Sequence, residues 1–149
     1  MATAPDVARY ILGRRGLMSA MKLQKLVYYS QGWHLAFEGE PLFDAPIEAW
    51  ANGPVVPELY AQHRGLFTVK ESTFTPGEPL TVAEQQTVDA VLVAYGDLDA
   101  HQLSNLTHNE RPWLEARRGV PDGARSNSEI DRATMLEFYE QVLRTAQAG

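Results

Sequence analysis

The most regular hydrophobic pattern of the chain lies between residues 20 and 38. Apolar side chains recur there every three or four positions, which places them on one wide face of a helix. The face consists of Leu23, Leu26, Val27, Ser30, Trp33 and Phe37, and Tyr28, Tyr29 and Leu35 widen it. The pattern predicts a central helix over residues 20–38, covered on more than one side and ended by Gly39.

The stretch after this helix has a different composition. Two prolines within residues 40–46 exclude a regular helix there. Residues 47–50 alternate apolar and polar side chains, which is typical of a short strand, and a turn at residues 52–54 leads into a short helix over about 56–63. A second strand within residues 66–74 is expected to pair with the first, giving a small antiparallel ribbon.

Further helices are predicted on both sides of these elements. One covers residues 5–15 and ends at Gly16. A capping box formed by Thr81 and Glu84 opens another, which runs to about Tyr95. Shorter helices are expected from Asp99 and from Pro112 to Gly119, and a last one from Ser128 after a loop over residues 120–127. The predicted fold class is mainly α (α+β): a single helical domain over residues 1–149 with a small antiparallel β ribbon.

Composition narrows the kinds of protein that the chain can be. Its 149 residues are 44% hydrophobic, which is enough for one packed core. No apolar run approaches the roughly 20 residues of a membrane span, and the N-terminus lacks the pattern of a secretory signal. The absence of cysteine excludes disulfides, thiolate catalysis and Cys-bound zinc. We therefore expect a soluble protein of the reducing cytoplasm.

The net charge of −6 is distributed unevenly along the sequence. Residues 1–37 carry five basic residues and one acidic residue, whereas residues 38–149 carry eight basic and eighteen acidic residues. An acidic protein lacks the cationic surface that binding to phosphate backbones needs, so we expect no nucleic-acid partner. The basic first section, which includes Lys22 and Lys25, suits either an acidic partner or a solvated helix surface.

Candidate catalytic and metal-binding groups are few. His101 and His108 lie seven residues apart, about 10.8 Å along a helix, which is too far for one metal ion. His34 and His63 would need the fold to bring them together, and we expect the histidines to be surface or capping residues. The sequence holds no nucleophile elbow, P-loop or metalloprotease motif. It predicts no metal, no cofactor and no enzymatic activity, with a histidine and carboxylate hydrolase as an alternative.

A stiff turn follows the first predicted strand. Gly53 and Pro54 fix a sharp bend, and Pro57 restricts the first turn of the next helix. Such a turn either docks Trp50 and Tyr60 onto the long helix or presents a preorganised binding surface. A preorganised surface loses little conformational entropy when a partner binds.

Three segments between residues 22 and 117 carry the most distinctive motifs. They read Lys22-Leu-Gln-Lys-Leu-Val-Tyr-Tyr-Ser-Gln-Gly-Trp-His-Leu-Ala36, Gly53-Pro-Val-Val-Pro-Glu-Leu-Tyr60 and His108-Asn-Glu-Arg-Pro-Trp-Leu-Glu-Ala-Arg117. Together, and in this order, they resemble the SocA-like antitoxin family, also called the Panacea domain or the GepA-like phage-associated group. The resemblance covers nearly the whole chain.

The resemblance implies a mostly helical antitoxin that neutralises a cognate protein toxin by direct binding. The relative that gives the family its name implies an alternative, a proteolytic adaptor that delivers its toxin to a AAA+ protease. Many members also carry an added helix-turn-helix segment for DNA binding. The present sequence has no room for one, so transcriptional autoregulation is not expected.

The partner is expected to contact three parts of the chain. They are the stiff turn with its aromatic neighbours, the segment from Trp113 to Arg117, and the basic part of the central helix. Tryptophan and arginine are frequent at binding hot spots, which favours the second part. The candidate partner-binding residues are Trp50, Asn52, Gly53, Pro54, Val55, Tyr60, Trp113, Arg117, Lys22 and Lys25. The same side chains also suit core packing, and the sequence leaves both interpretations open.

Overall fold

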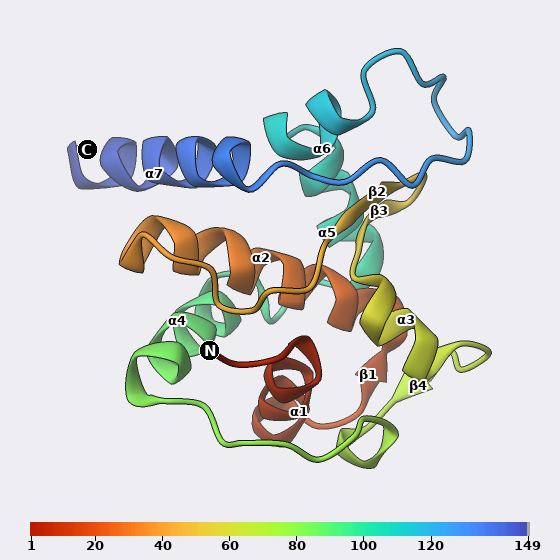
Figure 1. Ribbon diagram of the computed structural model, residues 1–149, viewed down its shortest axis with the longest axis vertical. Coiled ribbons are helices and arrows are strands. Elements are labelled where there is room, and N and C mark those ends of the chain that lie inside the picture. The colour runs from red at the N-terminus through yellow and green to blue at the C-terminus, as the bar shows by residue number, and fades with distance from the viewer. Residues whose placement is uncertain (149) are drawn as a thin grey trace.

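The central element of the structure is α2 (Ala20–Glu38), the longest of the described helices and the one with the most buried residues. In the computed structural model, which describes residues 1–148, α7 (Arg132–Ala148) packs on one side of α2 (Figure 1). The helices α1 (Ala4–Arg15) and α4 (Val82–Tyr95) pack on the other side. The fully buried side chains of α2 include Leu23, Leu26, Val27, Tyr28 and Tyr29. The predicted bounds of α2 and the mainly α class are confirmed.

Local capping fixes the ends of these helices. The Ser19 hydroxyl accepts a hydrogen bond from the Lys22 backbone N–H at 3.1 Å and begins α2. Gly39 ends it in the left-handed conformation, with a φ of 75°. The predicted capping box of Thr81 and Glu84 is present at the start of α4, with both reciprocal bonds formed.

The strands pair differently from the prediction. β2 (Glu48–Trp50) pairs with β3 (Gly53–Val55), whereas β4 (Thr68–Val69) pairs with β1 (Met18–Ser19), so the expected pairing of residues 66–74 with 47–50 is wrong. Only two residues separate β2 from β3, so the chain folds back directly into an antiparallel hairpin. The predicted turn therefore continues into a strand at Gly53.

The segment before α7 also adds to the hairpin. Residues 128–130 run along the outer edge of β2, where the Ala49 N–H donates to the Ser128 carbonyl at 2.8 Å. The Ile130 N–H donates to the Ile47 carbonyl at 2.8 Å. Because these backbone groups are used by the sheet, the last helix begins at Arg132 and not at Ser128 as predicted.

The remaining helices are short. They are α3 (Pro57–His63), the 3₁₀ helix η1 (Glu71–Thr73), α5 (Ala100–His108) and α6 (Arg111–Ala116). Asp99 caps α5, as predicted, and Pro112 lies in the first turn of α6. α3 directly continues β3, and α5 packs against β3. α3 and α5 therefore both lie next to β3 of the hairpin.

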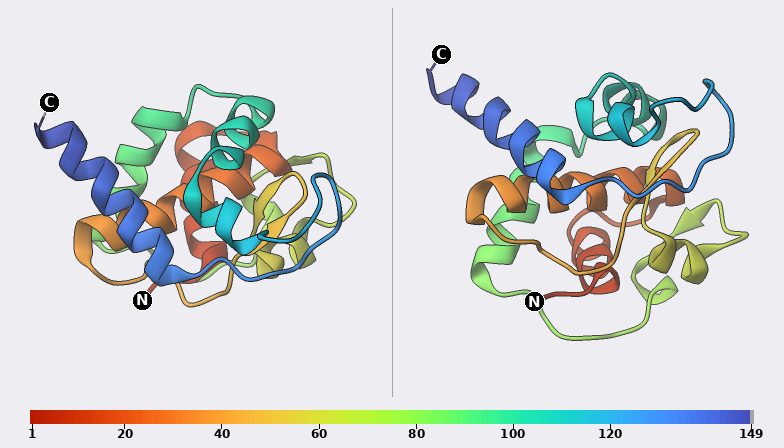
Figure 2. Two further views of the ribbon diagram at one scale, coloured as in Figure 1. Left: turned by 90° about the horizontal axis from the view of Figure 1, so that it is seen from above. Right: turned by 45° about the horizontal axis from the view of Figure 1, so that its top comes forward.

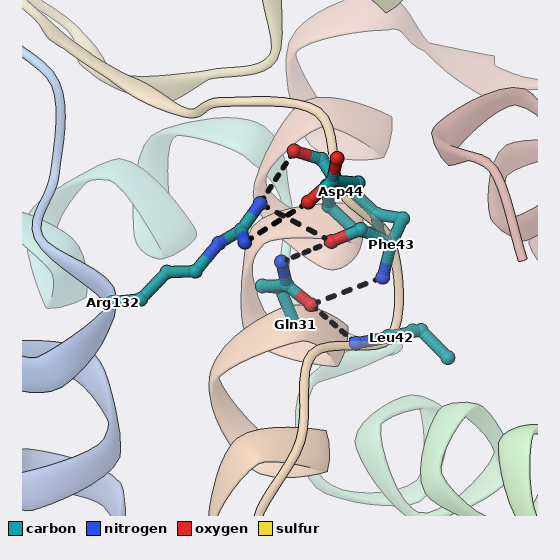
Figure 3. Close-up of polar contacts among 5 residues, drawn as sticks. All are labelled: Gln31, Leu42, Phe43, Asp44 and Arg132. Carbon is teal, nitrogen blue, oxygen red and sulfur yellow. Dashed lines mark hydrogen bonds and ion pairs between the residues drawn. The ribbon is translucent and has the colours of Figure 1, made fainter. Parts of the chain in front are cut away.

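A side-chain network ties the irregular segment after α2 to both α2 and α7 (Figure 3). The buried Gln31 amide donates to the Phe43 carbonyl at 2.8 Å and accepts from the Leu42 N–H at 2.7 Å. From α7, Arg132 donates to the carbonyls of Phe43 and Asp44 and pairs with the Asp44 carboxylate at 3.2 Å. These bonds satisfy backbone groups that no regular structure would pair.

Within residues 1–148, no helix has both the length and the apolar character that crossing a membrane requires.

Candidate partner-binding groove

A surface groove lies between the β2–β3 hairpin, the first turn of α2, α3 and the segment before residue 128. It encloses about 720 Å³. Its lining residues are Met21, Trp50, Ala51, Asn52, Val55, Tyr60, Arg125, Ser126 and Asn127. Four of the predicted partner-binding residues, Trp50, Asn52, Val55 and Tyr60, therefore line one groove.

The aromatic part of the groove consists of Trp50 and Tyr60. Their rings meet edge to face, with centroids 4.9 Å apart and an interplanar angle of 70°. The Trp50 indole N–H donates to Glu48 Oε1 at 2.9 Å, which fixes the orientation of the ring. Both side chains are only partly buried, so their faces remain accessible in a fixed geometry.

Two further predicted residues, Trp113 and Arg117, are buried and bond to backbone carbonyls of β2. They are only 6% and 5% exposed. The Trp113 indole N–H donates to the Trp50 carbonyl at 2.9 Å, and Arg117 donates to the Ala49 carbonyl at 2.9 Å. The structure thus places both residues outside the lining of the groove, where they hold the backbone of β2 at Trp50 and Ala49.

Arg117 also holds the segment on the other side of the groove. Its guanidinium donates to the carbonyls of Ala124 at 2.7 Å and Pro121 at 3.3 Å, and it lies over the Trp113 ring. One buried arginine therefore joins the hairpin to the loop between α6 and α7. Figure 2 shows this loop passing alongside the hairpin.

The turn of the hairpin is fastened to α5. The Ser104 hydroxyl donates to the Asn52 carbonyl at 2.6 Å. Beside it, His108 stacks on Trp113 with ring centroids 4.1 Å apart. Burial lowers the pKa of His108, and the positive charges of Lys25 and Arg117 lower it further. His108 is therefore neutral at physiological pH and acts as a packing group.

Lys25 is the most unusual residue of the site. It is fully buried, and its Nζ is the one buried side-chain polar atom without a hydrogen-bond partner among residues 1–148. It packs against Gly53, where an added β-carbon would lie 2.4 Å from Lys25 Cε and 3.3 Å from Nζ. Burial lowers the pKa of Lys25 to about 8, because no anion compensates the lost hydration.

A buried glutamine one residue before Lys25 anchors the end of the hairpin. Gln24 Oε1 accepts from the Val56 N–H at 2.8 Å, and its Nε2 donates to the Val56 carbonyl at 3.3 Å. Gly53 and Pro54, both predicted as contacts, are buried in β3 between this anchor and the turn. The backbone path of β3 is thus held by side chains of α2 and α5.

Lys22 lies apart from the groove. Its Nζ donates to the Gly96 carbonyl at 2.7 Å, at the junction between α4 and α5. The structure therefore does not bring Lys22 together with the other predicted residues.

Sequence reasoning missed five of the lining residues: Met21, Ala51, Arg125, Ser126 and Asn127. Met21 precedes Lys25 by one helical turn, so the helix pattern places both on one side of α2. Ala51 lies in the hairpin turn between two predicted residues. The other three belong to an irregular segment that carries no hydrophobic pattern. Their position depends on the pairing of residues 128–130 with β2, and no local sequence motif predicts this pairing.

The prediction that the histidines are surface or capping residues is wrong for two of them. His34 is buried, and its Nδ1 lies 2.8 Å from the Thr87 hydroxyl. His63 is buried, with its Nε2 2.9 Å from Gln24 Nε2. Both use a ring nitrogen in the core, and burial lowers the pKa of each. The described residues contain no group of three side chains that could hold a metal ion.

A second titratable cluster lies at the contact of α2, α6 and α7. Glu110 Oε1 accepts from the Tyr29 hydroxyl at 2.9 Å and from the Tyr139 hydroxyl at 3.1 Å. The Tyr28 hydroxyl lies 3.1 Å from that of Tyr139. Burial raises the pKa of Glu110 to about 7, although the two hydrogen bonds oppose the shift. This cluster fastens α7 to the central helix.

The fold and the groove together define a mainly helical protein with a rigid, partly aromatic surface cleft, a form suited to binding. The sequence model of the family described as "Antitoxin SocA-like, Panacea domain" matches residues 23–114. The matched range contains α2 from Leu23 onward, the hairpin, α3, α4 and α5, and so five of the nine residues that line the groove. The chain belongs to this family, as the three sequence segments predicted.

The chain is also similar to a curated protein whose name refers to the same antitoxin. Antitoxin SocA of Caulobacter vibrioides (strain NA1000 / CB15N) is 28% identical over an alignment of 111 residues, and the match covers 64% of this chain and 58% of the relative. The matched part of the chain thus spans less than two thirds of the relative's length. No solved structure matches the chain.

Proposed function

We propose that the protein is the antitoxin of a toxin–antitoxin pair and neutralises its protein toxin by direct binding at the groove, without catalysis. Family membership supports the antitoxin role. The main observation in support of the site is the partly exposed pair Trp50 and Tyr60, whose rings meet edge to face beside a hairpin that buried side chains hold in place. A surface prepared in this way loses little entropy on binding, and aromatic residues supply most of the energy at such sites.

The first experiment is co-expression of the tagged protein with the product of the neighbouring gene. That product should be toxic alone, should be tolerated when both are present, and should co-purify with the tagged protein. Failure of the neighbour to be toxic, or failure to form a complex, would contradict the antitoxin role.

The position of the site is tested with alanine variants. Trp50→Ala and Tyr60→Ala should weaken rescue and co-purification while the purified variants stay folded. Phe37→Ala is the control, because Phe37 is 42% exposed at the opposite end of α2. Loss of binding only in Phe37→Ala would place the site at that other end.

The amount of toxin in the rescued cells separates neutralisation by binding from degradation. Direct binding predicts that toxin persists at its full level beside the antitoxin. A fall in toxin that depends on the antitoxin would instead support the adaptor alternative, in which a AAA+ protease removes it.

A further inference from the structure

The groove has a charge opposite to that of the protein as a whole. Arg125 is the one charged residue among the described lining residues, and no carboxylate lines the groove. Lys25, which packs against Gly53, and Arg117, which bonds to the Ala49 carbonyl, add two buried positive charges next to the hairpin. Glu48 accepts the Trp50 indole N–H but does not line the groove. In a chain with a net charge of −6, this local excess of positive charge favours an acidic ligand.

The apolar part of the groove also includes a residue from the first turn of α2. Met21, which is 37% exposed, lines the groove directly after Ala20. The Ala20 N–H donates to the Phe67 carbonyl at 2.8 Å, which brings Phe67 beside this turn of the helix. Phe67 is 83% exposed. The apolar lining of the groove thus includes Trp50, Tyr60 and Met21, and the backbone of Phe67 lies next to the first turn of α2.

The polar lining residues of the groove, Arg125 to Asn127, have backbone groups without a backbone hydrogen-bond partner. Residues 125–127 are not helical, and none of their backbone groups bonds to another backbone group of residues 1–148. The same segment continues into the pairing of residues 128–130 with β2. Unpaired backbone N–H and C=O groups next to a strand are suited to hydrogen bonding with an extended chain.

We propose that the groove binds an extended acidic segment of the protein partner. Apolar side chains of this segment lie on Trp50, Tyr60 and Met21, a carboxylate pairs with Arg125, and its backbone bonds to residues 125–127. This inference rests on the proposed function, because it names the part of the toxin that the antitoxin recognises.

The probe is a library of random dodecapeptides displayed on phage and selected on the immobilised full chain. Selected sequences should combine Asp or Glu with aromatic or aliphatic residues. Their synthetic versions should bind more weakly at high salt, because a charge pair contributes. Arg125→Glu should weaken the dissociation constant by about tenfold or more, measured by fluorescence anisotropy.

Arg118→Glu is the matched control. Arg118 is exposed, lies in the same connecting segment and does not line the groove, so this charge reversal should leave peptide binding unchanged. Selection of neutral or basic peptides, selection of none, or equal loss in both variants would overturn the proposal. So would a dimer of the wild-type chain that Arg125→Glu dissociates in light scattering, because a second copy would then occupy the groove.

The two proposals fail separately. If acidic peptides bind as described and no neighbouring product is toxic, the groove chemistry stands and the antitoxin role does not. If the toxin is neutralised and Arg125→Glu neutralises it equally well, the antitoxin role stands and the acidic segment is wrong.

Discussion

Lys25 and Gly53 are in direct contact: a β-carbon on Gly53 would come within 2.4 Å of Lys25 Cε. The glycine therefore lets the hairpin lie directly on an unpaired, buried ammonium group. A buried charge without a partner opposes folding. Replacing Lys25 should therefore change the free energy of unfolding by a measurable amount.

Lys25→Met is expected to stabilise the protein. Because burial lowers the pKa of Lys25 from 10.5 to about 8, the variant should gain about 2–3 kcal/mol in the free energy of unfolding at neutral pH. The unfolded chain binds the proton more tightly, so the wild type recovers this stability as pH rises from about 8 to 10.5. Urea titrations across that range should show the two proteins converging. As a control, Lys70→Met replaces an exposed lysine and should change the free energy of unfolding little. If Lys25→Met is instead less stable than the wild type, other groups of the folded protein must stabilise the Lys25 charge.

Gly53→Ala should destabilise the protein by about 2–4 kcal/mol. Two causes act together: the φ of Gly53 is 123°, which disfavours any side chain, and the added methyl group collides with Lys25. A double-mutant cycle with Lys25→Ala separates them, because removing the lysine should recover at least about 1 kcal/mol of the loss. Strict additivity would mean that backbone strain alone accounts for the effect.

Glu110→Gln should remove a pH dependence of stability. Because the pKa of Glu110 is raised from 4.5 to about 7, the folded state binds its proton more tightly than the unfolded state. The wild type therefore loses stability as pH rises through this window, by about 1–3 kcal/mol after allowance for the partial exposure of the carboxyl group. The neutral amide still accepts from Tyr29 and Tyr139, so the variant should exceed the wild type above pH 7. Glu78→Gln, at an exposed acid, should follow the wild-type curve.

Arg117→Ala should lower stability by about 2–4 kcal/mol, because the carbonyls of Ala49 and Ala124 lose a charged donor. Hydrogen exchange should become faster in the hairpin and in residues 121–126, which this side chain connects. Arg118→Ala removes the adjacent exposed arginine and should change stability by less than about 0.5 kcal/mol. Unchanged exchange in Arg117→Ala would show that the groove holds its form without this residue.

The parts of the fold that local chemistry determines could be predicted from the sequence. The hydrophobic period and the residues at both ends define α2, and the Thr81–Glu84 box defines the start of α4. Strands of two or three residues carry almost no pattern, so their partners depend on tertiary contacts. For that reason β4 could not be assigned to β1, and residues 128–130 could not be placed beside β2.

The candidate site was predictable in part for the same reason. Trp50 and Tyr60 stand beside a proline-rich turn, and such residue types are frequent at binding surfaces. The sequence around Lys25 does not distinguish it from a solvated lysine. Its burial follows from tertiary packing, including the contact with Gly53, and is seen only in the structure. Arg125 was missed because its place in the groove follows from a strand pairing three residues later.

The two glutamines of α2 have a consequence for how such a protein can diversify. Gln24 and Gln31 lie two helical turns apart, and both bond to main-chain groups, of Val56 and of residues 42–43. Main-chain groups are the same for every residue type, so these anchors do not depend on the side chains that they hold. The exposed residues between positions 43 and 56 can therefore be exchanged while the chain keeps its path, whereas Gly53 and the buried core residues of this stretch cannot. One helix can in this way serve as a constant support for many different recognition surfaces, as the variable loops of an antibody share one framework.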